Sequence, residues 1–223
     1  MVKIAPSFLS ADFSALEREV RTVEAAGVEY IHLDVMDGHF VPNLTFGPMV
    51  VEAIRKVTEL TLDVHLMMTY PEKHLQAFAD SGADILTVHV EIEADLPDLL
   101  GRIRQEGMKA GASVKPATSE SALFSLLPFL DLALVMSVEP GFGGQAFMPE
   151  SLPKVRALKA DSRFDHIIQE HTINPYAGTA GYEKLKQTVQ TRGKIDSLAA
   201  PAKKSQEAAA PVVEAAVKGD RDS

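Results

Sequence analysis

The first 160 residues repeat one pattern: an amphipathic segment, a glycine, and then a short apolar run. "LEREVRTVEAAGVEYIHLDV", "HLQAFADSGADILTVHVE" and "LLGRIRQEGMKAGASVK" all follow it. In each, the glycine (Gly27, Gly82 or Gly107) stands where a helix would end in the left-handed conformation, which glycine tolerates. Regular alternation of helix and strand implies parallel strands joined by crossover helices.

Six such units are predicted before residue 160. The strands are expected at 3–6, 30–35, 61–67, 85–89, 109–114 and 132–138. The helices are expected at 14–26, 48–57, 71–81, 95–106, 119–127 and 149–160. This number of units in a chain of this length favours a (β/α)₈ TIM-type barrel, with a doubly wound sheet as the alternative.

Beyond Ala160 the pattern weakens. "FDHIIQEHTINPY" offers a seventh strand near 166–169 and "GYEKLKQTVQTR" offers a helix, but no convincing eighth strand follows. From Gly193 the chain lacks aromatic residues and is rich in Ala, Lys, Glu and Pro, which predicts a disordered tail. We therefore expect a barrel domain over residues 1–192, incomplete or altered at strands 7 and 8, and a tail over 193–223.

The composition narrows the classes of partner. The net charge is −9, the isoelectric point is about 5.3, and no basic patch stands out, which argues against nucleic acid and anionic membranes. The absence of cysteine excludes disulfides and thiolate chemistry and fits a reducing compartment. No segment has the apolar length of a signal peptide or a membrane span, so we expect a soluble cytoplasmic protein.

Polar side chains occupy one face of two predicted strands. In "IHLDVM" the apolar residues alternate with His32, Asp34 and Met36, and "LDVHLMM" places His65 and Met67 on the corresponding face of the next strand. A barrel strand turns one face inward, and barrel enzymes keep their active sites at the carboxyl ends of the strands. Two histidines and a carboxylate there would suit zinc, iron, manganese or cobalt. The alternative is an antiparallel sheet on whose wet face these groups are merely solvated.

A glycine-rich loop, "VEPGFGGQAF", follows the sixth predicted strand. Gly141, Gly143 and Gly144 can expose consecutive backbone N–H groups to an anion such as a phosphate, or let the loop move as a lid. The alternative is an ordinary flexible turn.

Other polar residues have simpler interpretations. Ser7 can donate to a substrate, although a lone serine is more often a turn or helix-entry residue. His39 and His74 are expected at the surface. His89, close to Glu91 at the end of the fourth predicted strand, either lines the site or is a hydrogen-bonded structural residue.

Several stretches taken together resemble the ribulose-phosphate 3-epimerase family over residues 3 to 160: "IAPSFLSADF", "HLDVMDGHFVPNLTFGP", "DVHLMM", "HVE", "VKPAT" and "VMSVEPGFGGQAFMPESLPKVRAL". The resemblance implies a (β/α)₈ barrel enzyme of the pentose phosphate pathway. It would interconvert D-ribulose 5-phosphate and D-xylulose 5-phosphate with one divalent metal ion, so the expected partner is a small sugar phosphate.

The resemblance also implies roles for individual residues. His32, Asp34 and His65 would bind the metal, and Asp34 would be one of two acid/base carboxylates. Ser7 and His65 would touch the substrate. The phosphate would be held by the loop residues Gly141, Phe142, Gly143 and Gly144.

The chain departs from the family after residue 160. Where the family has an Asp-Gly-Gly motif that supplies the fourth ligand and the second acid/base group, this chain has Glu170, His171 and Thr172. Glu170 is the candidate for both roles. The family's Gly-Ser phosphate contact at the eighth strand has no counterpart. We therefore expect weak phosphosugar binding, low activity and an exposed sheet edge that promotes homo-oligomers. The alternatives are an epimerase of a six-carbon ketose phosphate, and a non-catalytic metal or phosphosugar binder.

Overall fold

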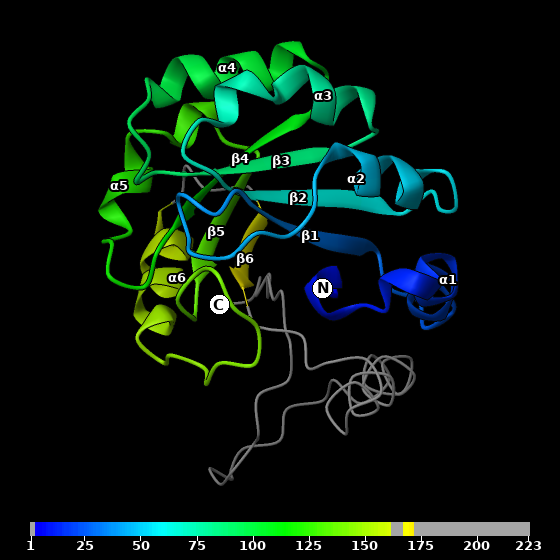
Figure 1. Cartoon of the computed structure of the whole chain (residues 1–223). Coiled ribbons are helices and arrows are strands. Elements are labelled where there is room, and N and C mark those ends of the chain that lie inside the picture. The colour runs from blue at the N-terminus through cyan, green and yellow to red at the C-terminus, as the bar shows by residue number, and fades with distance from the viewer. Residues whose placement is uncertain (1–2, 162–166, 172–223) are drawn as a thin grey trace, which may run out of the picture.

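The computed structural model describes residues 3–161 and 167–171. These residues form one curved parallel sheet whose strands are hydrogen-bonded in chain order (Figure 1). The strands are β1 (Tyr30–Met36), β2 (Thr61–Met67), β3 (Ile85–His89), β4 (Lys109–Val114), β5 (Leu132–Met136) and β6 (Ile167–His171). Every pair of neighbours is parallel, as the sequence predicted.

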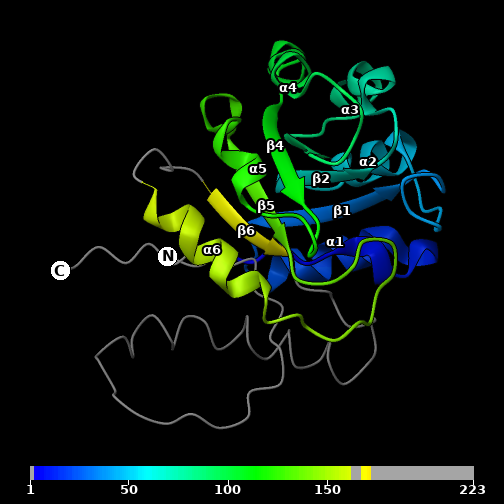
Figure 2. The same ribbon diagram turned by 90° about the vertical axis from the view of Figure 1, so that its left-hand side faces the viewer.

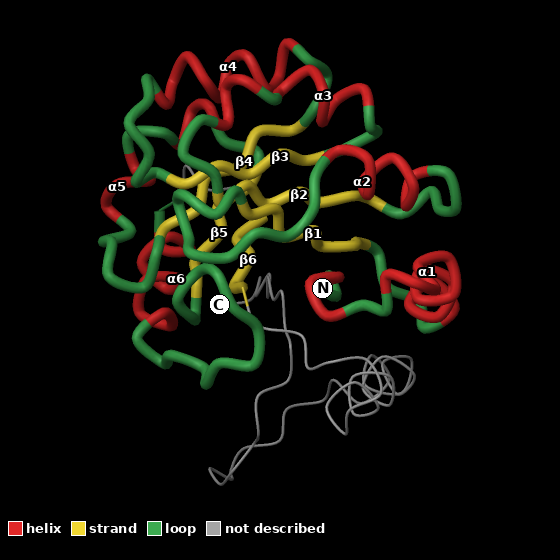
Figure 3. The backbone as a smooth tube through the Cα atoms, in the orientation of Figure 1, coloured by secondary structure: helices red, strands yellow, loops and turns green. Residues whose placement is uncertain are grey.

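The helices lie around the outside of this sheet, so that strands form an inner layer and helices an outer one (Figures 2 and 3). They are α1 (Leu16–Ala25), α2 (Pro48–Arg55), α3 (Leu75–Asp80), α4 (Leu96–Gln105), α5 (Ser121–Phe124) and α6 (Ser151–Ala160). Each crossover from strand to strand passes over the outer face, which is the arrangement of a (β/α) barrel. Among the described residues, no helix has the length and apolar character that crossing a bilayer requires.

The main core lies between the sheet and the helices. Ile31 and Leu33 of β1 are fully buried there together with Val51 and Ile54 of α2. Burial of each such side chain contributes about 1.5–3 kcal/mol. Because strand residues alternate between faces, the intervening residues of β1 must turn to the inside of the sheet, as predicted.

Glycines end three helices in the expected way. Gly27, Gly82 and Gly107 have φ of 79°, 87° and 88°, which residues with a Cβ rarely adopt. At Gly82 there is a second constraint, because a Cβ would lie 2.5 Å from the Cγ of Arg55.

The strand predicted at 3–6 is wrong. Instead of a ladder with β1 there is an isolated parallel bridge just beyond this segment, between Ser7 and His32, and a backbone hydrogen bond from His32 N to Pro6 O at 3.0 Å. Pro6 has no N–H to donate to β1. Directly afterwards, Ser7 accepts from Leu9 N and begins a 3₁₀ turn, so the ladder does not continue.

Two predicted helices are shorter than expected. The segment 71–81 divides into a 3₁₀ turn at Pro71–Lys73 and α3, because His74 (φ −123°, ψ 1°) leaves the helical conformation. The segment 119–127 contains only the four residues of α5, and a separate 3₁₀ turn with Pro128 inside it follows.

The seventh strand predicted near 166–169 is present as β6. The helix expected in "GYEKLKQTVQTR" and the tail over 193–223 lie outside the described residues, so the lack of an eighth strand and the domain boundary at 192 stay predictions.

Candidate active site

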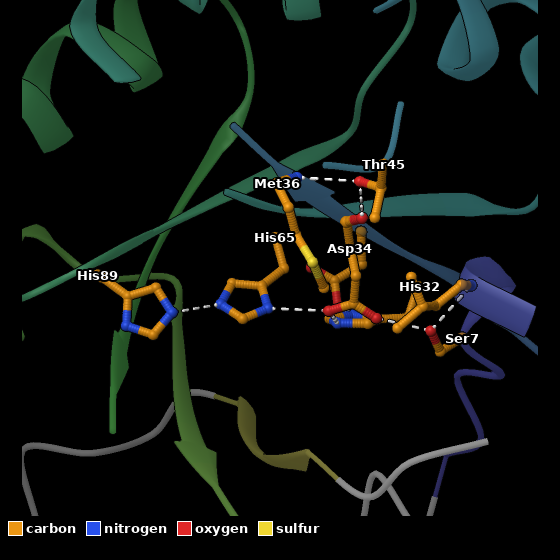
Figure 4. A network of polar contacts seen from close by, with 9 residues as sticks. Ser7, His32, Asp34, Met36, Thr45, His65 and His89 are labelled. Carbon is orange, nitrogen blue, oxygen red and sulfur yellow. Dashed lines mark hydrogen bonds and ion pairs between the residues drawn. The ribbon is translucent and has the colours of Figure 1, made fainter. Parts of the chain in front are cut away.

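The candidate site is on the inner face of the sheet, where β1 and β2 run side by side. Their register pairs His32 with Asp63 and Asp34 with His65. All four side chains are buried. Figure 4 shows His32, Asp34 and His65 converging, with Ser7 beside them. The sequence prediction that His32, Asp34 and His65 share the inner face is confirmed.

The carboxylate of Asp34 is the centre of this cluster. Its Oδ1 lies 3.3 Å from His32 Nε2 and 3.1 Å from His65 Nδ1, and its Oδ2 accepts a hydrogen bond from Ser7 Oγ at 2.6 Å. One ligand atom from each of His32, Asp34 and His65 lies within 4.8 Å of the others. Two imidazole nitrogens and a carboxylate oxygen, buried and convergent, are a donor set that fits a divalent transition metal.

The two histidines have opposite electrostatic surroundings. Burial alone would lower the pKa of His32, but the carboxylates of Asp34 and Asp63 outweigh it and raise this pKa to about 10. Burial outweighs the opposing effect of Asp34 and, with smaller contributions from His89 and His32, lowers the pKa of His65 to about 3. The carboxylates thus make the site a favourable place for a positive charge, and His65 is available as a neutral ligand.

Sequence reasoning missed Asp63 and left His89 open. Asp63 accepts from His32 Nδ1 at 2.8 Å. The available signal was its position two residues before His65, on the same face of β2. His89 is fully buried, and its Nε2 lies 2.9 Å from His65 Nε2, so it borders the site through His65. By contrast, His39 and His74 are exposed, as predicted.

A pocket opens next to Asp34. Its lining includes Ser7, Asp34, Met36, Met67, Met136 and Gly141. The methionines come from β1, β2 and β5 and give the pocket an apolar wall that offers no strong ligand to compete for a cation.

The glycine-rich loop reaches this pocket at Gly141 and Phe142. Gly141 adopts φ 120°, a Cβ there would lie 3.3 Å from Val41 Cβ, and its carbonyl accepts from Asn43 Nδ2 at 2.8 Å. Gly143 and Gly144 belong to the same loop but are not among the lining residues. A loop anchored in this way holds backbone groups of Gly141 and Phe142 near Asp34.

Comparison with known proteins agrees with this geometry. The model of the family described as the ribulose-phosphate 3 epimerase family matches residues 3–173. This chain belongs to that family. The match continues past residue 160, where the recognisable motifs end, and includes β6.

Relatives within the family are similar over most of their length. Ribulose-phosphate 3-epimerase of Synechocystis sp. is 50% identical over 191 residues, which cover 85% of this chain and 80% of that protein. The Bacillus subtilis protein of the same name is 51% identical over 159 residues, which cover 71% of this chain and 73% of that protein. The chain is therefore related to enzymes named as carbohydrate epimerases.

One relative bears on location. An Arabidopsis thaliana protein named ribulose-5-phosphate-3-epimerase, chloroplastic, is 44% identical over 180 residues. These residues cover 80% of this chain and 62% of the Arabidopsis protein. Family membership does not decide the compartment, and the cytoplasmic location stays a prediction.

Solved structures support the fold class. A mutant tryptophan synthase α-subunit from Pyrococcus furiosus superposes with a TM-score of 0.59 at 12% identity, covering 86% of each chain. The phospho-2-dehydro-3-deoxyheptonate aldolase of Thermotoga maritima superposes with a TM-score of 0.58 at 13% identity. The superposition covers 88% of this chain and 70% of the aldolase. At such low identity these similarities concern the fold alone.

The epimerase family would supply a further site residue from β6. In the register of β5 and β6, Glu170 pairs with Val135, a residue of the helix-facing core, and His171 pairs with Met136, a residue of the pocket lining. The structure describes β6 by its backbone, so the ligand and acid/base roles expected of Glu170 stay predictions.

Proposed function

We propose that this chain interconverts D-ribulose 5-phosphate and D-xylulose 5-phosphate by inversion at C3, with one divalent metal ion held by His32, Asp34 and His65. The observation that carries the proposal is the convergence of these three buried side chains on the Asp34 carboxylate, in a chain of the epimerase family. Zinc, iron, manganese and cobalt all suit the donor set.

Inversion of a carbon next to a ketone requires removal of its proton and return of a proton to the opposite face of a planar enediolate. Two acid/base groups on opposite sides of the substrate are therefore needed. Asp34 is the group that we assign to one side, because its carboxylate lies at the edge of the pocket. The hydrogen bond from Ser7 orients this carboxylate.

An unperturbed aspartate has a pKa of about 3.9 and is a weak base. A bound divalent ion supplies Lewis-acid stabilisation of the negative charge that develops on the substrate oxygens, which can contribute several kcal/mol in the transition state. The methionine wall formed by Met36, Met67 and Met136 limits the access of water to the reacting carbon.

The remaining contacts with the substrate follow from the pocket lining. Ser7 and His65 are proposed to touch the sugar, and the loop of Gly141, Phe142, Gly143 and Gly144 to hold the phosphate by its backbone N–H groups. The position of Gly141 in the pocket lining and its anchoring by Asn43 support this role.

The second acid/base group is proposed to come from β6. Glu170 corresponds in sequence to the family's aspartate, whereas the backbone register pairs His171 with the pocket residue Met136. Turnover of Glu170→Gln and His171→Gln distinguishes the two positions. A loss of about two orders of magnitude in one variant alone identifies the group.

Deuterium wash-in tests the proposed reaction against its alternatives. The protein is incubated in D₂O with ribulose 5-phosphate and, separately, with a six-carbon ketose phosphate, and C3 is followed by NMR. An epimerase incorporates deuterium at C3 and forms xylulose 5-phosphate. Binding without exchange would identify a phosphosugar binder, and exchange only with a six-carbon ketose phosphate would identify the other epimerase.

A further inference from the structure

A chain of polar side chains continues outward from the donor set, beyond His65. Glu91 Oε2 lies 2.9 Å from His89 Nδ1, His89 Nε2 lies 2.9 Å from His65 Nε2, and His65 Nδ1 lies 3.1 Å from Asp34 Oδ1. Figure 4 shows His89, His65 and Asp34 in one line. His89 and Glu91 take no part in the reaction proposed above.

The direction of these hydrogen bonds can be derived from Glu91, the outermost side chain of this row. Burial opposes ionisation of Glu91, but hydrogen bonds from His89, Thr118 and the backbone N–H of Lys115 outweigh it and lower its pKa to about 2. An ionised carboxylate only accepts, so His89 Nδ1 carries a proton and donates. A His65 that binds a metal through Nδ1 carries its proton on Nε2, so His65 Nε2 donates to His89 Nε2, which accepts.

In this arrangement the lone pair of His65 lies on Nδ1 and faces Asp34 Oδ1. Two acceptor atoms 3.1 Å apart repel each other, and a cation that binds both atoms makes their proximity favourable. The tilted ring of Phe40, whose centroid is 4.6 Å from that of His89, helps to hold the His89 imidazole in place.

We infer that Glu91 and His89 are positioning residues that select the tautomer of His65 and so direct its Nδ1 lone pair to a metal. The inference rests on the metal site of the proposed function. Metal-bound histidines commonly donate their other ring N–H to such a partner, and loss of the partner commonly weakens metal binding by about 10–100-fold.

His32, on the opposite side of the site, has the same arrangement of a carboxylate behind an imidazole. Asp63 Oδ2 lies 2.8 Å from His32 Nδ1, and His32 Nε2 lies 3.3 Å from Asp34 Oδ1. In both cases a carboxylate stands behind a histidine and directs a nitrogen of the site toward Asp34. On the His65 side the effect is transmitted through one additional imidazole.

Glu91→Gln tests the inference because it should reverse the direction of proton donation between Glu91, His89 and His65 without removing a hydrogen bond. Lys115 N donates to Glu91 Oε1 at 2.8 Å, so the glutamine oxygen should occupy that position and its NH₂ group should face His89 Nδ1. His89 would then carry its proton on Nε2, and His65 Nδ1 would donate to Asp34. We expect zinc affinity to fall about 10–100-fold while the fold is kept.

Zinc affinity is measured by competition with a chromogenic chelator, and the His89 tautomer by two-bond ¹⁵N–¹H correlation on zinc-loaded, ¹⁵N-histidine-labelled protein. The matched control is Glu24→Gln, which changes a carboxylate bonded to Thr58 and Arg21, away from the site. We expect an Nδ1–H tautomer of His89 in the wild type, an Nε2–H tautomer in Glu91→Gln, and wild-type zinc affinity in the control.

An Nε2–H tautomer of His89 in the wild-type protein would overturn the inference. So would unchanged zinc affinity in Glu91→Gln, or an equal loss of affinity in the control. A wild-type protein that binds zinc in none of these measurements would instead overturn the metal site on which the inference rests.

Discussion

Asp34→Asn removes the proposed base with little change of shape. In the wild type, Oδ2 of Asp34 accepts from Ser7 at 2.6 Å, and Oδ1 faces a ring nitrogen of both His32 and His65. Asparagine keeps one acceptor oxygen for one of these roles but cannot take up the C3 proton. Acid/base catalysis contributes about 10²–10⁴-fold, so we expect C3 exchange to fall by at least two orders of magnitude, or about 2.7 kcal/mol in activation free energy.

The assay is deuterium exchange at C3 under saturating ribulose 5-phosphate, together with the metal content of the same preparation. Asp84→Asn is the control, because Asp84 accepts from Leu62 N and Arg55 outside the pocket and should affect stability alone. Asp34→Asn protein that retains its metal and exchanges within tenfold of the wild type would refute the assignment of the base.

Two further predictions concern the metal and the fold. His32→Ala and His65→Ala should each lose most of the bound metal in elemental analysis, whereas the exposed His39→Ala should keep it; equal contents would contradict the donor set. Gly82→Ala should lower the free energy of unfolding more than Gly107→Ala, as denaturant titration would show. Both variants bear the positive-φ cost of about 1–2 kcal/mol, but only at Gly82 would a Cβ collide with another side chain, and equal losses would refute the difference.

The fold was predictable where a local rule decides it. The period-two alternation in β1 assigned Ile31 and Leu33 to the helices and His32 to the interior, because a strand has only two faces. Helix ends at glycine followed from the rarity of positive φ in other residues. The segment before Ser7 was mispredicted because its pattern resembles a strand, whereas pairing with β1 depends on N–H groups that Pro6 does not have.

The site was less predictable, because it depends on register between strands. Alternation places Asp34 and His65 on inner faces, but only the pairing of β1 with β2 shows that they are opposite each other. Face alone also does not show whether a histidine reaches its neighbour. For this reason His89 stayed open between two roles, and Asp63 was missed although it lies in a quoted motif.

The polar cluster is not required for filling the interior. On the same inner face, Ile85, Leu132 and Leu134 form a buried apolar cluster, against which Tyr30 packs. Buried ion pairs seldom stabilise a protein more than apolar side chains of the same volume would. His32 and Asp34 therefore occupy positions where packing alone would favour leucine or isoleucine, and their burial is most simply explained by the chemistry proposed for the site.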